Sequence, residues 1–221
     1  AGINVTASHN PKEYNGYKVY WADGAQLPPQ HAAAIAARLE QIDIFTGVKR
    51  IAFDDAVKAG LITLLGEETD KMFMSNVMAM INDRASVAQV ADSFKVVYTP
   101  FHGCGWKLVP EALRGLGVKN LYCVEQQMVL DGTFPTVASP NPENPEGFYL
   151  AIELADKVGA DFILGTDPDS DRVGIMVRGA DGKFIAVTGN QTGVLLLDYL
   201  IGAMRRAGKM PENPYFLKTI V

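Results

Sequence analysis

Short apolar runs and helix-forming runs alternate through the second half of the chain, and this order constrains the fold more than any other feature of the sequence. Runs rich in β-branched and aromatic residues predict strands over residues 94–98, 118–124, 161–165 and 173–177. The remaining runs predict helices over 106–116, 146–158 and 188–207. Such alternation is typical of a doubly wound α/β domain with a parallel sheet. We therefore predict the α/β fold class, with a parallel sheet in this part of the chain.

The first half of the chain carries weaker signals of the same kind. Strands are predicted over 3–6 and 17–21 and helices over 29–42 and 67–81, with turns at Asn15-Gly16, Asp23-Gly24 and Asp181-Gly182. Both ends of the chain, at Ala1-Gly2-Ile3 and over 216–221, have the composition of strands. Because natural proteins rarely begin and end inside strands, we expect an internal piece of a longer protein.

The composition excludes several classes of partner. The 221 residues carry a formal net charge of −5 and no block of Lys or Arg, which argues against a nucleic-acid or anionic-membrane surface. No apolar run reaches the length of a membrane span, and no signal peptide is expected. The two cysteines, Cys104 and Cys123, have no metal-site spacing and make no disulfide framework. We expect a cytoplasmic protein without nucleic-acid or membrane partners.

Three carboxylates alternate directly after the predicted strand 161–165, in the segment Asp167-Pro168-Asp169-Ser170-Asp171-Arg172. The carboxyl ends of strands are where open α/β sheets bind ligands. Three like charges this close repel one another unless a cation compensates them, and Mg²⁺ prefers such oxygen ligands. Asp167, Asp169 and Asp171 are therefore candidate metal ligands. The alternative without a ligand is a solvated acidic turn.

Two other kinds of acidic loop are known in proteins, and only one of them fits this segment. An EF-hand loop beginning at Asp167 would need Gly at its sixth position and Glu at its twelfth, where this sequence has Arg172 and Arg178. The segment 169–173 does fit the loose pattern of haloacid-dehalogenase-like phosphotransferases, in which the first Asp forms an aspartyl phosphate. That reading makes Asp169 a nucleophile, and it stays as an alternative mechanism.

A second polar loop, Thr6-Ala7-Ser8-His9-Asn10-Pro11, follows the first predicted strand. The Ser8 hydroxyl could carry a phosphoryl group, with His9 as a hydrogen-bond partner and Lys18 folding back across the turn. On these residues alone, a Ser-His pair in a polar loop more often has no catalytic role. The strand-to-helix turn 98–105, with its two glycines, could present backbone N–H groups to an anion, but glycines at helix starts are common.

Four segments in this order resemble the α-D-phosphohexomutase family, which includes phosphoglucomutases and phosphomannomutases. The segments are 6–11, similar to the family's phosphoserine loop, 99–103 at the opening of its second domain, 134–143 with Phe-Pro and Asn-Pro-Glu, and 167–172, similar to its metal loop. Ser170 stands where the family usually has Gly or Ala. The stretches 15–20 and 23–25 look most like the phosphoglucomutase/phosphopentomutase branch.

The resemblance implies a role for each matching residue. Ser8 would carry the phosphoryl group, and Asp167, Asp169 and Asp171 would bind Mg²⁺ together with the phosphoserine. Lys18 would act as general acid and base, with Arg172 and His9 around the transferring phosphate. The implied reaction moves phosphate between the 1- and 6-positions of a hexose phosphate, glucose phosphate first, through a sugar bisphosphate intermediate. The alternatives are a phosphomannomutase, a phosphopentomutase, the aspartyl-phosphate enzyme and a catalytically silent metal-binding fragment.

The resemblance also implies several α/β domains with mixed or parallel sheets sandwiched by helices, and it divides the chain among them. Residues 1–85 would be the later part of the first mutase domain, 86–188 the second domain and 189–221 the opening of the third. The family's sugar-recognition loop and its fourth domain, which holds the substrate's other phosphate, have no counterpart in these 221 residues. Because binding energy from the remote phosphate orients the sugar, we expect this chain alone to have little or no mutase activity.

Overall fold

The structure is a computed structural model that describes residues 2–218. The described chain divides into two compact units. One unit holds the residues up to 7 together with 15–71, and the other holds 8–14 together with the residues from 72 onward.

The first unit contains a small two-stranded sheet and two helices. Strand β1 (Gly2–Val5) pairs antiparallel with β2 (Tyr17–Tyr20), as the two predicted strands indicate. Helix α1 (Pro29–Leu39) begins with Pro29 at its first turn, where a missing N–H costs no hydrogen bond, and it is shorter than predicted. Helix α2 (Phe53–Lys58) was not predicted. Among the described residues of this unit only Ala56 is buried.

The second unit is built on a five-stranded sheet with the strand order β4-β3-β5-β6-β7. The strands are β3 (Lys95–Thr99), β4 (Asn120–Cys123), β5 (Phe162–Thr166), β6 (Val173–Arg178) and β7 (Phe184–Val187). Strands β4, β3 and β5 are parallel, whereas β6 and β7 continue the sheet antiparallel. The sheet is therefore mixed. The loop 167–172 between β5 and β6 is a hairpin connection, too short for a parallel crossover.

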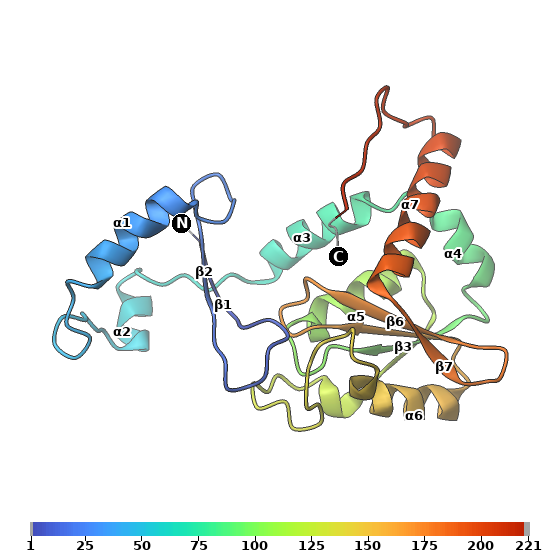
Figure 1. Cartoon of the computed structure of the whole chain (residues 1–221), viewed down its shortest axis with the longest axis horizontal. Helices are drawn as coiled ribbons and strands as arrows, with labels where there is room; N and C mark the ends of the chain where they lie inside the picture. The colour runs from blue at the N-terminus through green and yellow to red at the C-terminus, as the bar shows by residue number, and fades with distance from the viewer. Residues whose placement is uncertain (1, 219–221) are drawn as a thin grey trace. The chain divides into compact units, whose positions relative to one another are not determined.

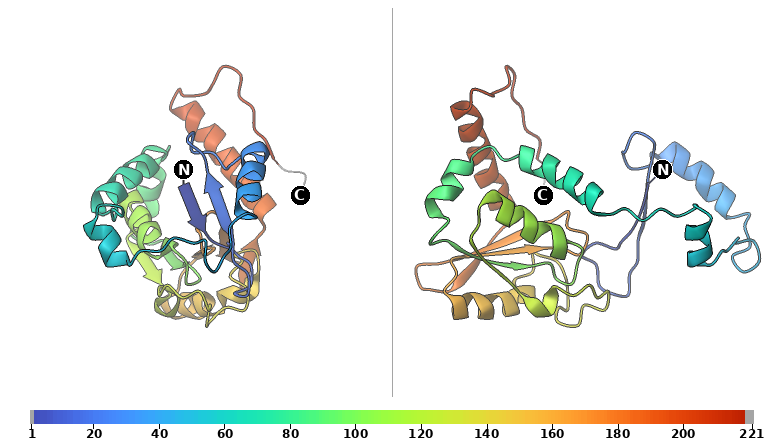
Figure 2. Two further views of the ribbon diagram at one scale, coloured as in Figure 1. Left: turned by 90° about the vertical axis from the view of Figure 1, so that its left-hand side faces the viewer. Right: turned by 180° about the vertical axis from the view of Figure 1, so that it is seen from behind.

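Helices cover both faces of this sheet, as Figures 1 and 2 show. Helix α5 (Gly105–Leu116) connects β3 to β4 on one face, and α6 (Tyr149–Val158), preceded by the 3₁₀ turns η1 (Glu125–Gln127) and η2 (Pro145–Phe148), leads to β5 on the other. The core beneath α6 is formed by apolar residues of the sheet and the helix, among them Val97, Ile163, Met176, Ala151 and Ala155. This arrangement confirms the predicted α/β class.

Three further helices belong wholly or partly to this unit. They are α3 (Glu67–Ala79), α4 (Arg84–Val90), which was not predicted, and α7 (Gly189–Arg206). Helix α7 begins with a capping box between Thr188 and Gln191, and the left-handed Gly208 follows its end. Residues 216–218 lie in no strand, and the rest of the strand predicted over 216–221 lies outside the described residues.

The sheet topology brings two loops together at one edge. Thr99 and Gly165 are register partners in the parallel pair β3–β5, so the turn that follows β3 and the acidic loop that follows β5 leave the sheet side by side. The chain leaves β3 toward β4 on one side while β5 lies on the other, which makes this edge a topological switch point. Ligands of open α/β sheets bind at such points.

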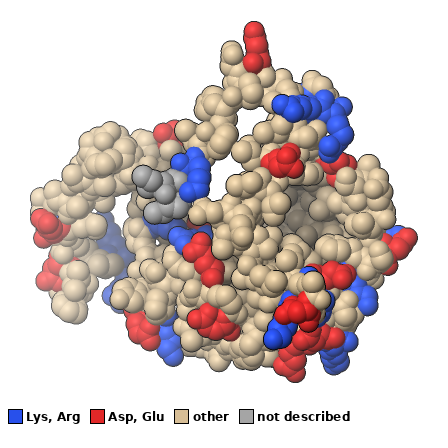
Figure 3. Space-filling view, turned by 45° about the vertical axis from the view of Figure 1, so that its right-hand side comes forward, with Lys and Arg blue, Asp and Glu red and all other residues tan. Residues whose placement is uncertain are grey.

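The surface in Figure 3 carries interspersed acidic and basic side chains, and neither sign dominates the face shown. Among residues 2–218, no helix combines the length and the apolar character that a membrane crossing needs.

Candidate functional site

The acidic loop is a tight hairpin whose own backbone fixes Asp167. The Ser170 N–H donates to the Asp167 carbonyl at 3.0 Å, and the Arg172 N–H donates to the Asp167 carboxylate Oδ1 at 3.0 Å. Ser170 adopts a left-handed φ of 59°, which lets the chain turn back into β6. As a result, the Asp167 side chain is held at the base of the loop and is fully buried.

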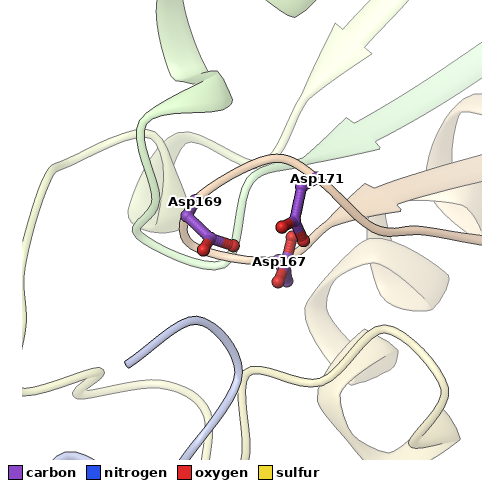
Figure 4. A group of neighbouring side chains, drawn as sticks. All are labelled: Asp167, Asp169 and Asp171. Atoms are coloured by element: carbon purple, nitrogen blue, oxygen red, sulfur yellow. The ribbon is translucent and has the colours of Figure 1, made fainter. Parts of the chain in front are cut away.

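The three carboxylates converge, as Figure 4 shows. One oxygen from each of Asp167, Asp169 and Asp171 lies within 4.8 Å of the others, and exposure increases from Asp167 to Asp171. Burial raises the pKa of Asp167 above its ordinary value, and the neighbouring Asp169 acts in the same direction. The Ser8 hydroxyl and the Arg172 amide oppose this rise by hydrogen-bonding to the carboxylate. A compensating cation would relieve the remaining unfavourable charge.

The serine loop meets this carboxylate group directly. The Ser8 hydroxyl donates to Asp167 Oδ2 at 2.6 Å, across 159 positions of sequence. His9 Nδ1 lies 3.1 Å from the same Ser8 oxygen. Because an ionised carboxylate can only accept, the Ser8 proton is directed at Asp167, and His9 Nδ1 is then placed to donate to Ser8. Ser8 itself has a left-handed φ of 54°, so the loop presents it in a conformation that is uncommon for a residue other than glycine.

The two predicted basic residues, Arg172 and Lys18, lie in different units of the structure. Arg172 is the last residue of the acidic loop before β6, it is exposed, and its backbone N–H donates to the Asp167 carboxylate. Lys18 lies in the middle of β2, which belongs to the other compact unit. The role of each side chain toward a phosphate therefore stays a prediction from the sequence.

The glycine turn 99–105 supports the acidic loop. The Cys104 N–H donates to the Pro168 carbonyl at 2.8 Å. A Cβ atom at Gly103 would lie 2.3 Å from the Pro168 Cα, which real side chains do not tolerate. The N–H groups of His102, Gly103 and Cys104 all donate to carbonyl oxygens, so they are not available to the anion that the sequence suggested. The two loops instead pack backbone against backbone.

A partly buried chain of hydrogen bonds holds the same turn in place. The His102 ring lies between the Val129 carbonyl, at 2.9 Å from Nδ1, and the Thr136 hydroxyl, at 2.9 Å from Nε2. A carbonyl can only accept, so Nδ1 carries the proton and Nε2 accepts from Thr136. Gln127 donates to Thr136 at 3.0 Å and accepts from Thr99. His102 is thus a satisfied structural histidine that ties the turn to the loop 127–136.

The acidic loop has the donor chemistry of a site for a hard divalent cation. Its three converging groups are all carboxylate oxygens, which hard divalent cations prefer over nitrogen or sulfur ligands. The Ser8 oxygen adjoins the same cluster through its bond to Asp167. The residues present therefore fit an ion of this class.

Comparison with known sequences gives the family. The profile described as "Phosphoglucomutase/phosphomannomutase, alpha/beta/alpha domain II" matches residues 71–182, and the corresponding domain I profile matches residues 1–44. The chain belongs to the phosphoglucomutase/phosphomannomutase family. This confirms the resemblance seen in the sequence. It also removes the main reason for the aspartyl-phosphate alternative at Asp169, since that chemistry is typical of a different family.

Individual relatives agree with this family. A phosphoglucomutase of Staphylococcus epidermidis is 37% identical over 203 residues, and a phosphomannomutase of Mycoplasmoides pirum is 35% identical over 220 residues. The matches cover 91% and 99% of this chain but only 36% and 38% of those proteins. A phosphoglucomutase/phosphomannomutase family protein from Burkholderia thailandensis has the same fold, with a TM-score of 0.59 at 22% identity over 93% of this chain and 38% of that one.

The sequence reasoning missed the residues that support the acidic loop. The sequence indicated Gly103 and Gly105 only as part of a possible anion site, and it indicated no role for the hydroxyls of Tyr98 and Thr166. The glycines were the available signal, because glycine in a strand-to-helix turn also marks a close approach of two backbones. Which backbone approaches could not be read from the sequence.

Proposed function

We propose that this chain is the phosphoserine- and metal-bearing part of a phosphosugar mutase, in which Ser8 carries the transferred phosphoryl group. The observation that supports it best is the hydrogen bond from Ser8 to Asp167, 2.6 Å long, which joins two loops that are far apart in sequence. A phosphoryl group on Ser8 would lie beside the three carboxylates, whose mutual repulsion already favours a bound cation.

The charges support an arrangement with a metal. Three carboxylates, one Mg²⁺ and a phosphoserine sum to about −3, and two basic residues, Lys18 and Arg172, would bring this to about −1. Mg²⁺ held by Asp167, Asp169 and Asp171 would supply charge neutralisation for the phosphoryl oxygens. Phosphoryl transfer depends mainly on positioning and electrostatics, so the chain's own task is to hold Ser8 and these charges in fixed geometry.

The remaining roles are assigned to His9 of the serine loop, to Asp167 and Arg172 of the acidic loop and to Lys18 of β2. Asp167 orients the Ser8 hydroxyl when no phosphate is attached, and His9, 3.1 Å from the Ser8 oxygen, is placed to donate to that oxygen. The Arg172 side chain lies at the exposed end of the acidic loop and is assigned to the phosphate. Lys18 is assigned the proton of the sugar hydroxyl that receives the phosphoryl group, on the basis of its position in the sequence motif.

Membership of the family supports a hexose phosphate as the substrate class. The proposed reaction moves phosphate between the 1- and 6-positions of a hexose phosphate through a bisphosphate intermediate, with glucose phosphate as the first substrate to test. The two relatives above are named for glucose and for mannose, so mannose phosphate is the second. A cytoplasmic location and the division into mutase domains at residues 1–85, 86–188 and 189–221 stay predictions.

The chain spans a little more than a third of the length of the relatives that it matches. We expect no ordinary mutase turnover from it alone, because the remote phosphate of the substrate would have no binding site to orient the sugar. A coupled assay for glucose 6-phosphate checks this. Turnover at the rate of a complete mutase would contradict it.

Phosphosite mapping by mass spectrometry tests the central proposal. The protein is analysed as purified and after incubation with Mg²⁺ and glucose 1,6-bisphosphate. Phosphate on Ser8 in either sample supports the carrier role. Phosphate on Asp169 that is lost in alkali would instead support the aspartyl-phosphate mechanism.

A catalytically silent metal-binding fragment is the second candidate function, and the carboxylate cluster is the observation that favours it. Calorimetric titration with Mg²⁺ separates it from the first. Mg²⁺ binding without phosphate on Ser8 would favour this candidate, and absence of Mg²⁺ binding would contradict the metal site in both.

A further inference from the structure

Three hydroxyl groups form a chain beneath the acidic loop. Tyr98 lies near the end of β3, Thr166 at the end of β5, and Ser170 in the loop itself. The Tyr98 hydroxyl is 2.9 Å from Thr166 Oγ1, and the Ser170 hydroxyl donates to the same Thr166 oxygen at 3.4 Å. Tyr98 and Thr166 are buried, so Thr166 links a strand of the core to the loop that carries the carboxylates.

Ser170, in the middle of the loop, has an unfavourable backbone conformation that its side-chain hydrogen bond can offset. Ser170 has a φ of 59°, a conformation that is strained for an L-residue and costs a glycine almost nothing. Serine at this position gains the contact to Thr166 that glycine could not make. The side chain thus has a function at a position where the backbone alone would favour glycine.

The first turn of α5 closes over the three hydroxyls. A Cβ atom at Gly105 would lie 2.4 Å from Ser170 Oγ and 2.4 Å from the Tyr98 hydroxyl. Only glycine at position 105 therefore leaves room for the three hydroxyl groups. Burial raises the pKa of Tyr98, so its hydroxyl keeps its proton throughout the working range of pH.

We propose that Tyr98, Thr166 and Ser170 are positioning residues that set the direction of Asp169 and Asp171 toward Asp167. Ser170 lies between Asp169 and Asp171 in sequence, so its torsion angles decide where both carboxylates point. The inference rests on the proposed metal site. It goes beyond that proposal because groups that bind no metal, the three hydroxyls, would control the direction of the carboxylates that do.

Magnesium titration by calorimetry, paired with thermal unfolding, tests this role. Ser170→Gly removes the hydroxyl and relieves the backbone strain, so we expect an unchanged or higher Tm together with roughly fivefold weaker Mg²⁺ binding. A merely structural role predicts that Tm and affinity move in the same direction. Tyr98→Phe should weaken Mg²⁺ binding by a similar factor of about five. Tyr122→Phe removes a hydroxyl from the neighbouring strand β4, where Tyr122 packs against the core beneath α6, and it should leave Mg²⁺ affinity unchanged.

The double variant Tyr98→Phe with Ser170→Gly provides the second measurement. If the hydroxyls act as one unit, its loss of affinity is smaller than the product of the two single losses. Wild-type affinity in Ser170→Gly, or fully multiplicative losses, would overturn the positioning proposal while the metal site stands. Absence of Mg²⁺ binding by the unchanged protein would overturn the metal site, and the positioning proposal with it.

Discussion

Ser8 and Ser170 lie in two loops and share nearly the same left-handed backbone, with φ values of 54° and 59°. Their hydroxyls have different partners. Ser8 donates to the buried carboxylate of Asp167, whereas Ser170 donates to the neutral hydroxyl of Thr166. Ser8 is therefore hydrogen-bonded to a charged group of the candidate metal site, and Ser170 to a neutral group of the buried core.

The difference shows that backbone conformation alone does not identify a functional serine. Both conformations are uncommon for residues other than glycine, and both occur beside the carboxylates. What separates the two serines is the charge and the burial of the group at the end of each hydrogen bond. A phosphoryl group on Ser8 would lie among metal-binding carboxylates, whereas one on Ser170 would meet the closely packed Gly105.

The largest expected effect tests the two serines against each other. Ser8→Ala should abolish phosphate incorporation from glucose 1,6-bisphosphate, because the carrier oxygen is gone. Ser170→Ala should still be phosphorylated at Ser8. Mass-spectrometric phosphosite mapping of both variants checks this, and phosphate incorporated into Ser8→Ala would refute the assignment of the carrier.

The next largest effect concerns the carboxylates that distinguish Ser8 from Ser170. Asp169→Asn removes one charged ligand from the cluster, and we expect Mg²⁺ affinity to fall at least tenfold, or about 1.4 kcal/mol. Calorimetric titration measures the loss. The control is Asp181→Asn in the β6–β7 hairpin, which should bind Mg²⁺ as the unchanged protein does. Equal affinities for the two variants would show that the acidic loop is not a metal site.

A third prediction tests the support beneath Ser170. Gly103→Ala places a methyl group 2.3 Å from the Pro168 Cα, so the turn and the acidic loop must separate. We expect the free energy of unfolding to fall by about 2 kcal/mol. Gly132→Ala, where no atom lies within 4 Å of the added group, should change it by less than about 0.5 kcal/mol. Urea unfolding measures both. Similar values for the two variants would show that the turn is not tightly packed.

The smallest effect comes from a region away from both serines. Asp83 caps α4 by accepting from the Ser86 N–H, and its carboxylate also pairs with Arg206 at 2.9 Å. The Ser86 amide and then its hydroxyl hold the pKa of Asp83 below the ordinary value, with Arg206 adding to this. Its contribution is therefore present above the pKa of the unfolded chain and is lost as the pH falls through the folded pKa.

Asp83→Asn should accordingly lower stability at neutral pH and flatten the acid limb of the stability curve, with Mg²⁺ affinity unchanged. Thermal unfolding between pH 3 and pH 7 and one calorimetric titration measure this. A change in Mg²⁺ affinity would show that the site is sensitive to any loss of stability, which would weaken every comparison between the two serines.

Sequence patterns predicted most of the second unit. The strands β3, β4, β5 and β6 and the helices α5, α6 and α7 lie within a few residues of their predicted ranges, because apolar periodicity reports the burial of each element. Helices α2 and α4 were missed, since each is only six or seven residues long and too short to show a period. Strand β7 had no predicted range of its own, and its antiparallel pairing with β6 was indicated only by the Asp181-Gly182 turn.

The sequence by itself determined the α/β class, the family and the identity of the candidate carboxylates and serine, because all of these are carried by local patterns. The tertiary structure decided which groups meet. It joined Ser8 to Asp167 across 159 positions, assigned the two glycines of the 99–105 turn to packing, and placed Tyr98 and Thr166 under Ser170. The physical reason is that strand order brings the ends of β3 and β5 together, and this order depends on the packing of whole elements rather than on any local run of residues.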